Sequence, residues 1–305
     1  MKAIIFPGQG SQTPGMCSEL YHKYPYVRTL WEEANDLLGF SLSNIILEGA
    51  AEDLKRTSYT QPGLFLAGVS VWRVLEEETG VTEQDVFLAG HSVGEYAALV
   101  AAKSLEFSDA IKVLGVRGQI MEEAEVDGGL VALIGGETED VERLVWETND
   151  QCLDSCSIAL FNAPSQHVVG GPRKTLAVLK EKVAAPIRRA VDVAVSGPFH
   201  TPYMAFAQER LLPILKAMII SPPERCVFSS VTGAKLEGVE DVRAALSLQT
   251  QGPVLWTHVM RLLYNAEVRN AVEAGPGTVL AGLMRKTVAD LVVRPYDAVL
   301  EEYAK

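Results

Sequence analysis

The chemistry that this sequence offers begins at Ser92, within the stretch GHSVG at residues 90–94. Apolar residues run into Gly90 and an alanine-rich helical pattern follows Gly94, so the serine falls at a turn between a strand and a helix. Such a turn requires little bulk at its glycines, exposes the hydroxyl and aims it at the positive end of the helix. An ordinary tight turn is the competing interpretation, because short patterns of this kind also arise by chance.

A serine hydroxyl becomes a good nucleophile when a base takes its proton, and histidine is the usual base. The chain has five histidines. His91 adjoins the serine and is expected to point elsewhere, while His22, His167 and His258 lie in stretches that favour surface or packing roles. His200, in VSGPFHTPYM, falls in a loop before a helix, where catalytic residues often lie, and is by elimination the candidate base.

Composition limits the partners that such a site can have. The 305 residues are 48% hydrophobic and 22% charged, which is typical of a globular protein with a sizeable core. A formal net charge of -12 argues against nucleic acid, because phosphate binding draws on clustered Lys and Arg. An anionic substrate therefore has to meet a local positive group.

Neither the N-terminus nor the cysteines indicate a membrane or a metal. The apolar run in MKAIIFPGQG is too short for a signal peptide or a spanning helix, so we expect a cytoplasmic protein without a membrane partner. The four cysteines have no zinc-ligand spacing, and we expect them to be reduced: Cys17, Cys152, Cys156 and Cys226.

Strands and helices alternate along the first part of the chain. Strands are predicted at 2–8 and 84–92, and helices at 62–80 and 108–125, the second with Ser108 as its N-cap. After residue 200 we expect a helix at 201–219, a strand at 225–233 and a helix at 252–268. This order predicts an α/β core with a mainly parallel sheet, whose ligands bind at the carboxyl ends of the strands.

The pattern changes between residues 126 and 196. The expected order is a strand at 129–135, a helix at 138–150, two strands within 157–171, a helix at 172–184 and a strand at 187–196. A β-α-β-β-α-β order is that of the ferredoxin-like unit. We therefore predict an inserted ferredoxin-like subdomain at 126–196 within a large catalytic subdomain made of 1–125 and 197–305.

Six motifs in order along the chain resemble those of malonyl-CoA:acyl-carrier-protein transacylases, which have a hydrolase-like core. They are FPGQGSQ at 6–12, GHSVGEY at 90–96, VRGQIM with Arg117, NAPSQ at 162–166, GPFH at 197–200 and GPGTVL at 275–280. The resemblance spans nearly the whole chain. It implies malonyl transfer from coenzyme A to the phosphopantetheine thiol of an acyl carrier protein, through a serine ester and without a cofactor or metal.

The resemblance assigns further roles around the serine. Ser92 matches the nucleophile and His200 the general base, and the backbone N–H groups of Gln9 and Val93 match the oxyanion hole. The family orients its histidine through a backbone carbonyl, which falls here at about Gln249. Asp192, the carboxylate that a Ser-Asp-His order would use, is then a surface charge at a strand end.

Substrate choice is tied to four positions. Malonyl differs from acetyl by a free carboxylate, which the guanidinium of Arg117 can hold with two parallel hydrogen bonds. Val93 and Phe199 resemble the malonyl-selective pattern, and Phe199 in the substrate pocket would crowd an α-methyl branch. Pro198 departs from the alanine more common in the family, which leaves the preference among substituted malonyl groups open.

The sequence leaves the partner and the reaction class partly open. Acyl carrier proteins are acidic, and the basic residues Arg173, Lys174, Lys180, Lys182, Arg188 and Arg189 suggest a docking face, or alternatively a solvated helix face. The carrier could serve fatty-acid or polyketide synthesis. An acyl hydrolase of the same fold and a carrier-binding subunit without activity are the competing functions. The composition demands no partner chain, so we expect a monomer.

Overall fold

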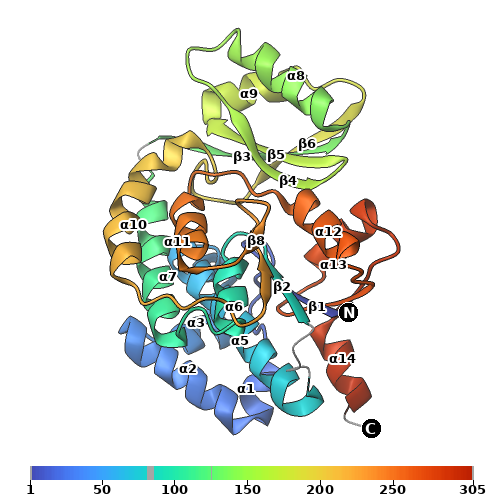
Figure 1. Ribbon diagram of the computed structural model, residues 1–305. Coiled ribbons are helices and arrows are strands. Elements are labelled where there is room, and N and C mark those ends of the chain that lie inside the picture. Colours follow the sequence, from blue (N-terminus) through green and yellow to red (C-terminus); the bar gives the residue numbers. More distant parts are fainter. Residues whose placement is uncertain (1, 81–85, 125, 304–305) are drawn as a thin grey trace.

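The computed structural model describes residues 2–80, 86–124 and 126–303, and it contains two separate sheets (Figure 1). The larger sheet is parallel except for its last strand, in the order β10-β9-β1-β2-β7-β8. The predicted α/β core with a mainly parallel sheet is confirmed. The strands of this sheet are β1 (Lys2–Phe6), β2 (Val86–Gly90), β7 (Cys226–Phe228), β8 (Lys235–Leu236), β9 (Asn270–Glu273) and β10 (Val292–Pro295).

The two central strands bring distant loops to one edge of the sheet. β1 and β2 run parallel in register from Lys2 opposite Val86 to Phe6 opposite Gly90, so both strands end at the same level. The loops that follow them carry Gln9 and Ser92. Because parallel sheets bind ligands at the carboxyl ends of their strands, this edge is where a site is expected.

Helices surround the larger sheet and form most of the core with it (Figure 1). The N-terminal helices, which we did not predict, are α1 (Ser18–Lys23), α2 (Pro25–Leu38), α3 (Leu42–Leu47) and α4 (Ala51–Leu54). The others are α5 (Thr57–Thr79), α6 (Gly94–Ala101), α7 (Phe107–Glu122), α10 (Ala205–Ala217) after the short 3-10 helix η1 (Pro202–Met204), α11 (Val239–Leu248), α12 (Trp256–Asn265), α13 (Val279–Thr287) and α14 (Tyr296–Tyr303).

Several predicted helix starts are wrong: α10 begins at Ala205 and not at 201, and α12 begins at Trp256 and not at 252. α5 begins five residues before Pro62, because the Glu122 carboxylate at the end of α7 accepts hydrogen bonds from the Ser58 N–H and hydroxyl at 2.8 and 3.0 Å. A side chain from another helix thus satisfies a free N–H of the first turn. α7 begins at Phe107, so the predicted N-cap Ser108 lies inside its first turn.

The smaller sheet is antiparallel, in the order β4-β5-β3-β6. Its elements follow one another along the chain as β3 (Gly128–Gly135), α8 (Thr138–Asn149), β4 (Ser157–Ala163), β5 (Gln166–Pro172), α9 (Arg173–Glu181) and β6 (Ile187–Val193). Each of the predicted strands and helices of this segment is present, and most of their bounds differ by a few residues.

Side chains of β3 alternate between two cores. Val131 and Leu133 pack into a small core beneath α8 and α9, whereas Leu130 belongs to the main core. The side chains of β5 are divided in the same way: Val168 belongs to the main core and Val169 to the small core. Alternate residues of a strand point to opposite faces, so one face of the smaller sheet carries its own helices and the other faces the larger body (Figure 1).

The remaining differences from the sequence prediction are in length. The strand expected at 225–233 has three residues, Cys226–Phe228, and the chain after it turns back so that β8 pairs with it. The described residues leave out residues 84 and 85, at the start of a predicted strand, and residue 125, at the end of a predicted helix. They also leave out residues 1, 304 and 305, at the outer ends of the predicted large subdomain. Among the described residues, no helix is long and apolar enough to cross a membrane.

Candidate active site

Ser92 lies on a strained turn between β2 and α6. Its φ is +52°, in the left-handed region that residues with a side chain rarely adopt. A Cβ at Gly90 would lie 2.1 Å from the Glu95 nitrogen, and one at Gly94 would lie 2.3 Å from the Phe6 carbonyl oxygen. Both glycines are therefore needed for the turn itself, which supports a functional turn over a chance pattern.

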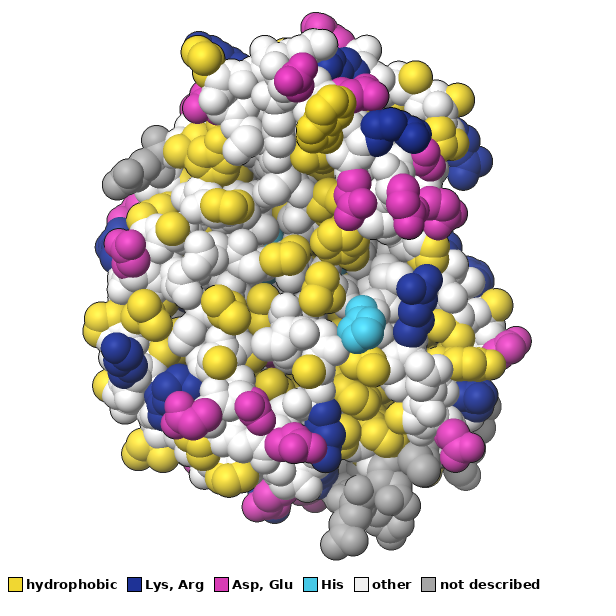
Figure 2. Space-filling model, turned by 45° about the horizontal axis from the view of Figure 1, so that its top comes forward, with side chains coloured by type: hydrophobic (Ala, Val, Ile, Leu, Met, Phe, Trp, Pro, Cys, Tyr) yellow, Lys and Arg dark blue, Asp and Glu magenta, His cyan; other side chains and the backbone are white. Residues whose placement is uncertain are grey.

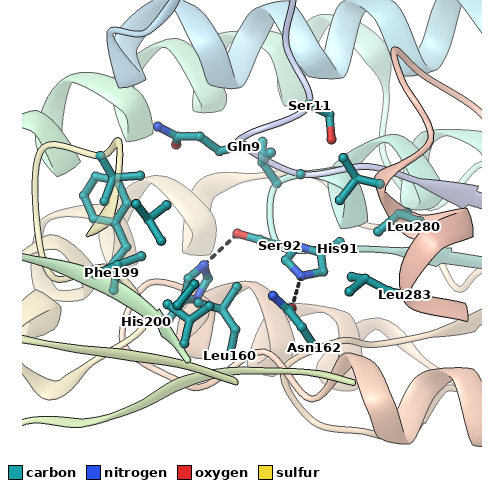
Figure 3. A pocket seen from close by; sticks show the side chains of 18 of the residues that line it. Gln9, Ser11, His91, Ser92, Leu160, Asn162, Phe199, His200, Leu280 and Leu283 are labelled. Atoms are coloured by element: carbon teal, nitrogen blue, oxygen red, sulfur yellow. Dashed lines mark hydrogen bonds between the residues drawn. The ribbon is translucent and has the colours of Figure 1, made fainter. Parts of the chain in front are cut away.

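The Ser92 hydroxyl is hydrogen-bonded to His200. Its Oγ lies 2.7 Å from His200 Nε2 (Figure 3). The other ring nitrogen, Nδ1, lies 3.1 Å from the Gly252 carbonyl oxygen, which can only accept, so Nδ1 carries the proton. In the neutral ring Nε2 is then the acceptor, and the serine hydroxyl donates to it.

The surroundings of His200 keep its ring neutral. Burial, followed by the positive charge of Arg117 and by His91, lowers the pKa of His200 to about 3. The Gly252 and Gln249 carbonyls oppose this shift. At neutral pH the imidazole is therefore unprotonated and able to accept the serine proton.

Gln249 differs in part from its predicted role. The carbonyl within 3.1 Å of His200 Nδ1 belongs to Gly252, three residues further along the chain, and the carbonyl of Gln249 adds a smaller effect on the ring. The Gln249 side chain does something the sequence did not reveal. Its Nε2 donates to the Ser92 carbonyl at 3.0 Å, and its Oε1 accepts from Arg117 at 3.1 Å.

Two backbone N–H groups beside the serine are free to bind an oxyanion. In the turn, the N–H groups of Gly94 and Glu95 donate to the carbonyls of His91 and Ser92. Within the described part of the chain, the N–H groups of Val93 and Gln9 have no acceptor. Both residues line the same cavity as Ser92.

Arg117 is a buried cation held by neutral groups. It is 1% exposed, and its guanidinium donates to the side-chain oxygens of Gln61 and Gln249. Its Nε has no hydrogen-bond partner, and none of the salt bridges among the described residues involves it. Burial lowers the pKa of Arg117, as expected for a charge taken out of water.

The cavity around Ser92 lies between the two sheets and has a volume of about 220 Å³. The loops of the larger sheet supply its reactive groups, with His200 and Phe199 on one side of Ser92 and Leu280 and Leu283 of α13 on the other (Figure 3). The smaller sheet supplies an apolar wall. This wall consists of Leu130, Ala132, Leu160, Val168 and Val193.

The other histidines and Asp192 lie outside the serine–base pair. His22 and His258 are exposed, and His167 is buried in the smaller region with its Nε2 3.0 Å from the Thr138 hydroxyl. Asp192 is exposed and forms an ion pair with Lys180 at 3.0 Å. The Gly252 carbonyl takes the position beside His200 that a triad carboxylate would occupy.

Sequence reasoning missed two polar residues of the cavity. Asn162 accepts a hydrogen bond at 2.9 Å from His91, which points away from Ser92 as expected (Figure 3). Gln61 lines the cavity and orients Arg117. Asn162 stands in the motif NAPSQ, which could have indicated it, whereas no local pattern marks Gln61.

Comparison with known proteins identifies the family of this chain. The acyl transferase domain family matches residues 3–296. The malonyl CoA-acyl carrier protein transacylase of Haemophilus influenzae is 38% identical over 296 residues, covering 95% of this chain and 93% of the relative. That of Bacillus subtilis is 36% identical, covering 93% of this chain and 89% of the relative.

Solved structures give the same result. The malonyl-CoA:acyl carrier protein transacylase of Xanthomonas oryzae superposes with a TM-score of 0.92 at 35% identity, covering 99% of this chain and 98% of that one. A malonyl-transacylase in complex with its type II PKS acyl-carrier protein has a TM-score of 0.93 at 34% identity, covering 99% of each chain. The chain therefore belongs to the acyl transferase family, among the malonyl CoA-acyl carrier protein transacylases.

Proposed function

We propose that this protein transfers malonyl from malonyl-CoA to the phosphopantetheine thiol of an acyl carrier protein through an ester on Ser92. The observation that carries this proposal is the 2.7 Å hydrogen bond between Ser92 and a neutral His200 in this cavity. The buried cation Arg117 does not itself line the cavity, but it donates a hydrogen bond to Gln61, which does. The names of the relatives support both substrates.

In the first half-reaction His200 acts as the general base. Its Nε2 takes the Ser92 proton as Oγ attacks the thioester carbonyl, and the Gly252 carbonyl stabilises the imidazolium through Nδ1–H. The N–H groups of Val93 and Gln9 stabilise the oxyanion. Collapse of the tetrahedral intermediate breaks the carbon–sulfur bond, and His200 returns its proton to the leaving coenzyme A thiol.

The second half-reaction reverses these steps with another thiol. His200 takes the proton of the phosphopantetheine thiol, whose sulfur attacks the malonyl ester, and Ser92 leaves with the proton. The two substrates bind in turn, so the kinetics are ping-pong. Every proton moves between Ser92, His200 and the thiols, and this mechanism needs no cofactor beyond the thioester substrate.

Arg117 selects the malonyl carboxylate in this proposal. A buried guanidinium without an anionic partner is costly, and a substrate carboxylate would offset that cost. Gln61 and Gln249 fix the orientation of the planar guanidinium by accepting from its two terminal nitrogens. Phe199, which is buried against the cavity, limits the space beside the reacting carbonyl and disfavours an α-branch.

Transfer rather than hydrolysis is favoured by the apolar wall. Leu130, Leu160 and Val168 line one wall of the cavity, and these side chains offer a water molecule no hydrogen bond. A hydrolase of neutral acyl chains would gain nothing from Arg117. An inactive carrier-binding subunit would have no need for the strained φ values of Ser92 and His200, +52° and +61°.

We further propose that the smaller sheet and its two helices form an inserted ferredoxin-like subdomain at about 126–196, and that the rest is a hydrolase-like catalytic subdomain. The β-α-β-β-α-β order and the separate small core support the first part. The Gly-x-Ser-x-Gly turn between β2 and α6 supports the second.

The carrier protein is proposed to dock on basic residues of this smaller region. Lys174, Arg188 and Arg189 are exposed and form no ion pair within the described part of the chain, whereas Arg173 and Lys180 pair with Asp127 and Asp192. The unpaired group offers positive charge to an acidic carrier. Whether that carrier serves fatty-acid or polyketide synthesis depends on the carrier and not on the chemistry of the site.

Intact-protein mass spectrometry after incubation with malonyl-CoA tests the proposal. The unaltered protein should gain one malonyl group, and Ser92→Ala should gain none. His258→Ala, which changes an exposed histidine, is the matched control and should load normally. A malonyl adduct on Ser92→Ala would contradict the proposed nucleophile. Light scattering in the same buffer tests the expected monomer.

A further inference from the structure

Gln9 is held in place by its side chain. Its backbone N–H is proposed to bind the oxyanion, whereas its side-chain amide points away from Ser92 (Figure 3). The Nε2 atom of this amide donates to the Thr57 hydroxyl at 3.2 Å, which is the one hydrogen bond of Gln9 within the described part of the chain. The side chain of Gln9 therefore anchors the loop that carries the N–H group.

The residues on both sides of Gln9 are glycines. A Cβ at Gly8 would lie 2.5 Å from the His91 carbonyl oxygen, so Gly8 packs directly on the turn that carries Ser92. Gly10 is exposed and has a φ of +110°, and a Cβ there would meet open space. Glycine has the greatest backbone freedom of all residues. The loop thus touches the serine turn at Gly8, but the direction of the Gln9 N–H depends on a contact outside the loop, which is Thr57.

Thr57 also contacts the loop that carries the base. Its Oγ1 lies 3.3 Å from the Ser196 hydroxyl oxygen. Ser196 belongs to the segment 194–201, which joins β6 to η1 and contains His200. A hydroxyl can accept from one group and donate its own proton to another, so Thr57 can bond to both partners at once. Two loops that are far apart in the sequence thus meet at one side chain.

The position of Thr57 is itself fixed. Thr57 is the first residue of α5 and is 1% exposed. The next residue, Ser58, donates from its N–H and its hydroxyl to Glu122 of α7. Gly118 of α7 packs against the same turn so closely that a Cβ there would lie 2.7 Å from the Thr57 carbonyl oxygen. A side chain buried between two packed helices can hold a loop more accurately than a surface contact can.

We propose that Thr57 is a positioning residue for acyl transfer, which ties the oxyanion loop (residues 7–12) to the loop of His200 (residues 194–201). This role presupposes transfer through Ser92 and therefore rests on the proposed function. Through Gln9, Thr57 holds one oxyanion donor beside the serine, and through Ser196 it keeps that donor in register with the base. Thr57 itself binds no substrate and moves no proton.

The consequence is a loss of rate that is equal for different acyl groups. The oxyanion forms on the thioester carbonyl, which malonyl and acetyl share, whereas Arg117 is proposed to act on the carboxylate that malonyl alone has. Removal of a whole oxyanion donor slows catalysis by about 10²- to 10³-fold. In Thr57→Val the Gln9 N–H is present and merely less well aimed, so we expect a loss of about tenfold.

The test is single-turnover acyl loading of Thr57→Val, measured by rapid quench and intact-protein mass spectrometry over a range of malonyl-CoA or acetyl-CoA concentrations. The maximal rate should fall about tenfold with both substrates, and the half-saturating concentrations should stay within about twofold. Thr57→Ser, which keeps the hydroxyl, should load within about threefold of the unaltered rate. An unchanged rate in Thr57→Val, a fall confined to malonyl, or a Thr57→Ser as slow as Thr57→Val would overturn the proposal.

Thr60→Val is the matched control. Thr60 lies three residues further along α5 and is 0% exposed, and its hydroxyl donates to the carbonyls of Leu54 and Arg56 instead of to either loop. The change replaces the same atoms in the same helix. Thr60→Val should load both acyl groups within about twofold of the unaltered rate. If it lost as much rate as Thr57→Val, the loss would reflect a weakened α5 and the proposal would fail.

Two further variants cover the case in which Thr57→Val does not fold. Gln9→Met keeps the backbone N–H and the length of the side chain but removes the amide that Thr57 holds, so loading should slow about tenfold with both substrates. Ser196→Ala removes the other partner of Thr57, in an exposed position, and should slow loading about threefold. The unaltered loading rate in either variant would overturn the proposal. Failure of the proposed function is distinguishable, because the unaltered protein would then gain no acyl group.

Discussion

The two sheets of this protein contribute to the cavity in opposite ways. The larger, parallel sheet and its loops supply Ser92, His200 and the N–H groups beside them, and helix α5 supplies Gln61, which accepts a hydrogen bond from Arg117 of α7. The smaller, antiparallel sheet supplies mostly apolar side chains to the cavity, together with Asn162 and Gln166. Its region also carries most of the exposed basic residues discussed above. Figure 2 shows yellow apolar side chains gathered around the hollow between the upper and lower parts of the molecule.

The reactive groups thus lie in the larger region, and the residues proposed to bind the carrier protein lie in the smaller one. Strained backbone and buried charge need a rigid surrounding, and the main core provides it around Ser92. The smaller sheet has its own core beneath α8 and α9, so its outer residues can vary without disturbing the serine and histidine. Substitutions in the two regions should therefore have effects of different size and kind.

The largest effect is expected at His200. His200→Ala should slow malonyl loading by roughly 10²- to 10⁴-fold, because the serine loses the base that takes its proton. Single-turnover loading measured by rapid quench checks this value. His167→Ala, which removes a buried histidine of the smaller region, should leave the loading rate within a few-fold. Equal losses in the two variants would remove the distinction between the regions.

Arg117→Ala should have the next largest effect, on selectivity. We expect the ratio of malonyl to acetyl loading to fall about 100-fold, near 3 kcal/mol, which is the scale of a charged hydrogen-bond pair lost in a buried site. Competition between the two acyl-CoA substrates gives the ratio directly. Arg143→Ala changes an exposed arginine of α8 and should not alter it. Retained selectivity in Arg117→Ala would refute the clamp.

Charge reversal at basic residues of the smaller region should weaken binding of the carrier protein without changing the reaction with malonyl-CoA. The triple change Lys174→Glu, Arg188→Glu and Arg189→Glu should raise the KM for the carrier protein about tenfold, mostly through slower association. Malonyl loading of Ser92 should not change. Steady-state kinetics at two salt concentrations measure both. An unchanged carrier KM would discard this docking face.

The smallest effect is expected at Asp192. Asp192→Ala breaks an exposed ion pair with Lys180, and such pairs contribute little, so stability should change by less than about 0.5 kcal/mol. Activity should remain within about twofold. Urea unfolding and malonyl transfer measure the two quantities. A loss of several orders of magnitude in transfer would show that a Ser-His-Asp triad operates after all.

The sequence predicts the smaller region better than the larger one. Most of its strands are short apolar runs and its helices are amphipathic, so local pattern suffices for β3 to β6. The start of α5 depends on Glu122, 64 residues away, and the short strands β8 to β10 depend on pairing across the sheet. Such tertiary contacts leave no local signal.

The same division applies to the candidate site. The Gly-x-Ser-x-Gly spacing marks Ser92, and elimination among five histidines leaves His200. The choice of the Gly252 carbonyl over Gln249 depends on where the loop after α11 turns, and the hydrogen bond between Gln61 and Arg117 joins separate helices. Residue types and spacing predict reactive groups, whereas the groups that tune them become visible in the fold.

The most direct test of the account follows the fate of the malonyl ester. Malonyl-enzyme freed of coenzyme A is mixed with phosphopantetheinylated carrier protein or with buffer alone, and both species are followed by intact-protein mass spectrometry. We predict that the malonyl group leaves Ser92 and appears on the carrier before free malonate accumulates, and that it persists on Ser92 in buffer. Release as malonate at the same rate with and without the carrier would contradict a transferase and identify a hydrolase.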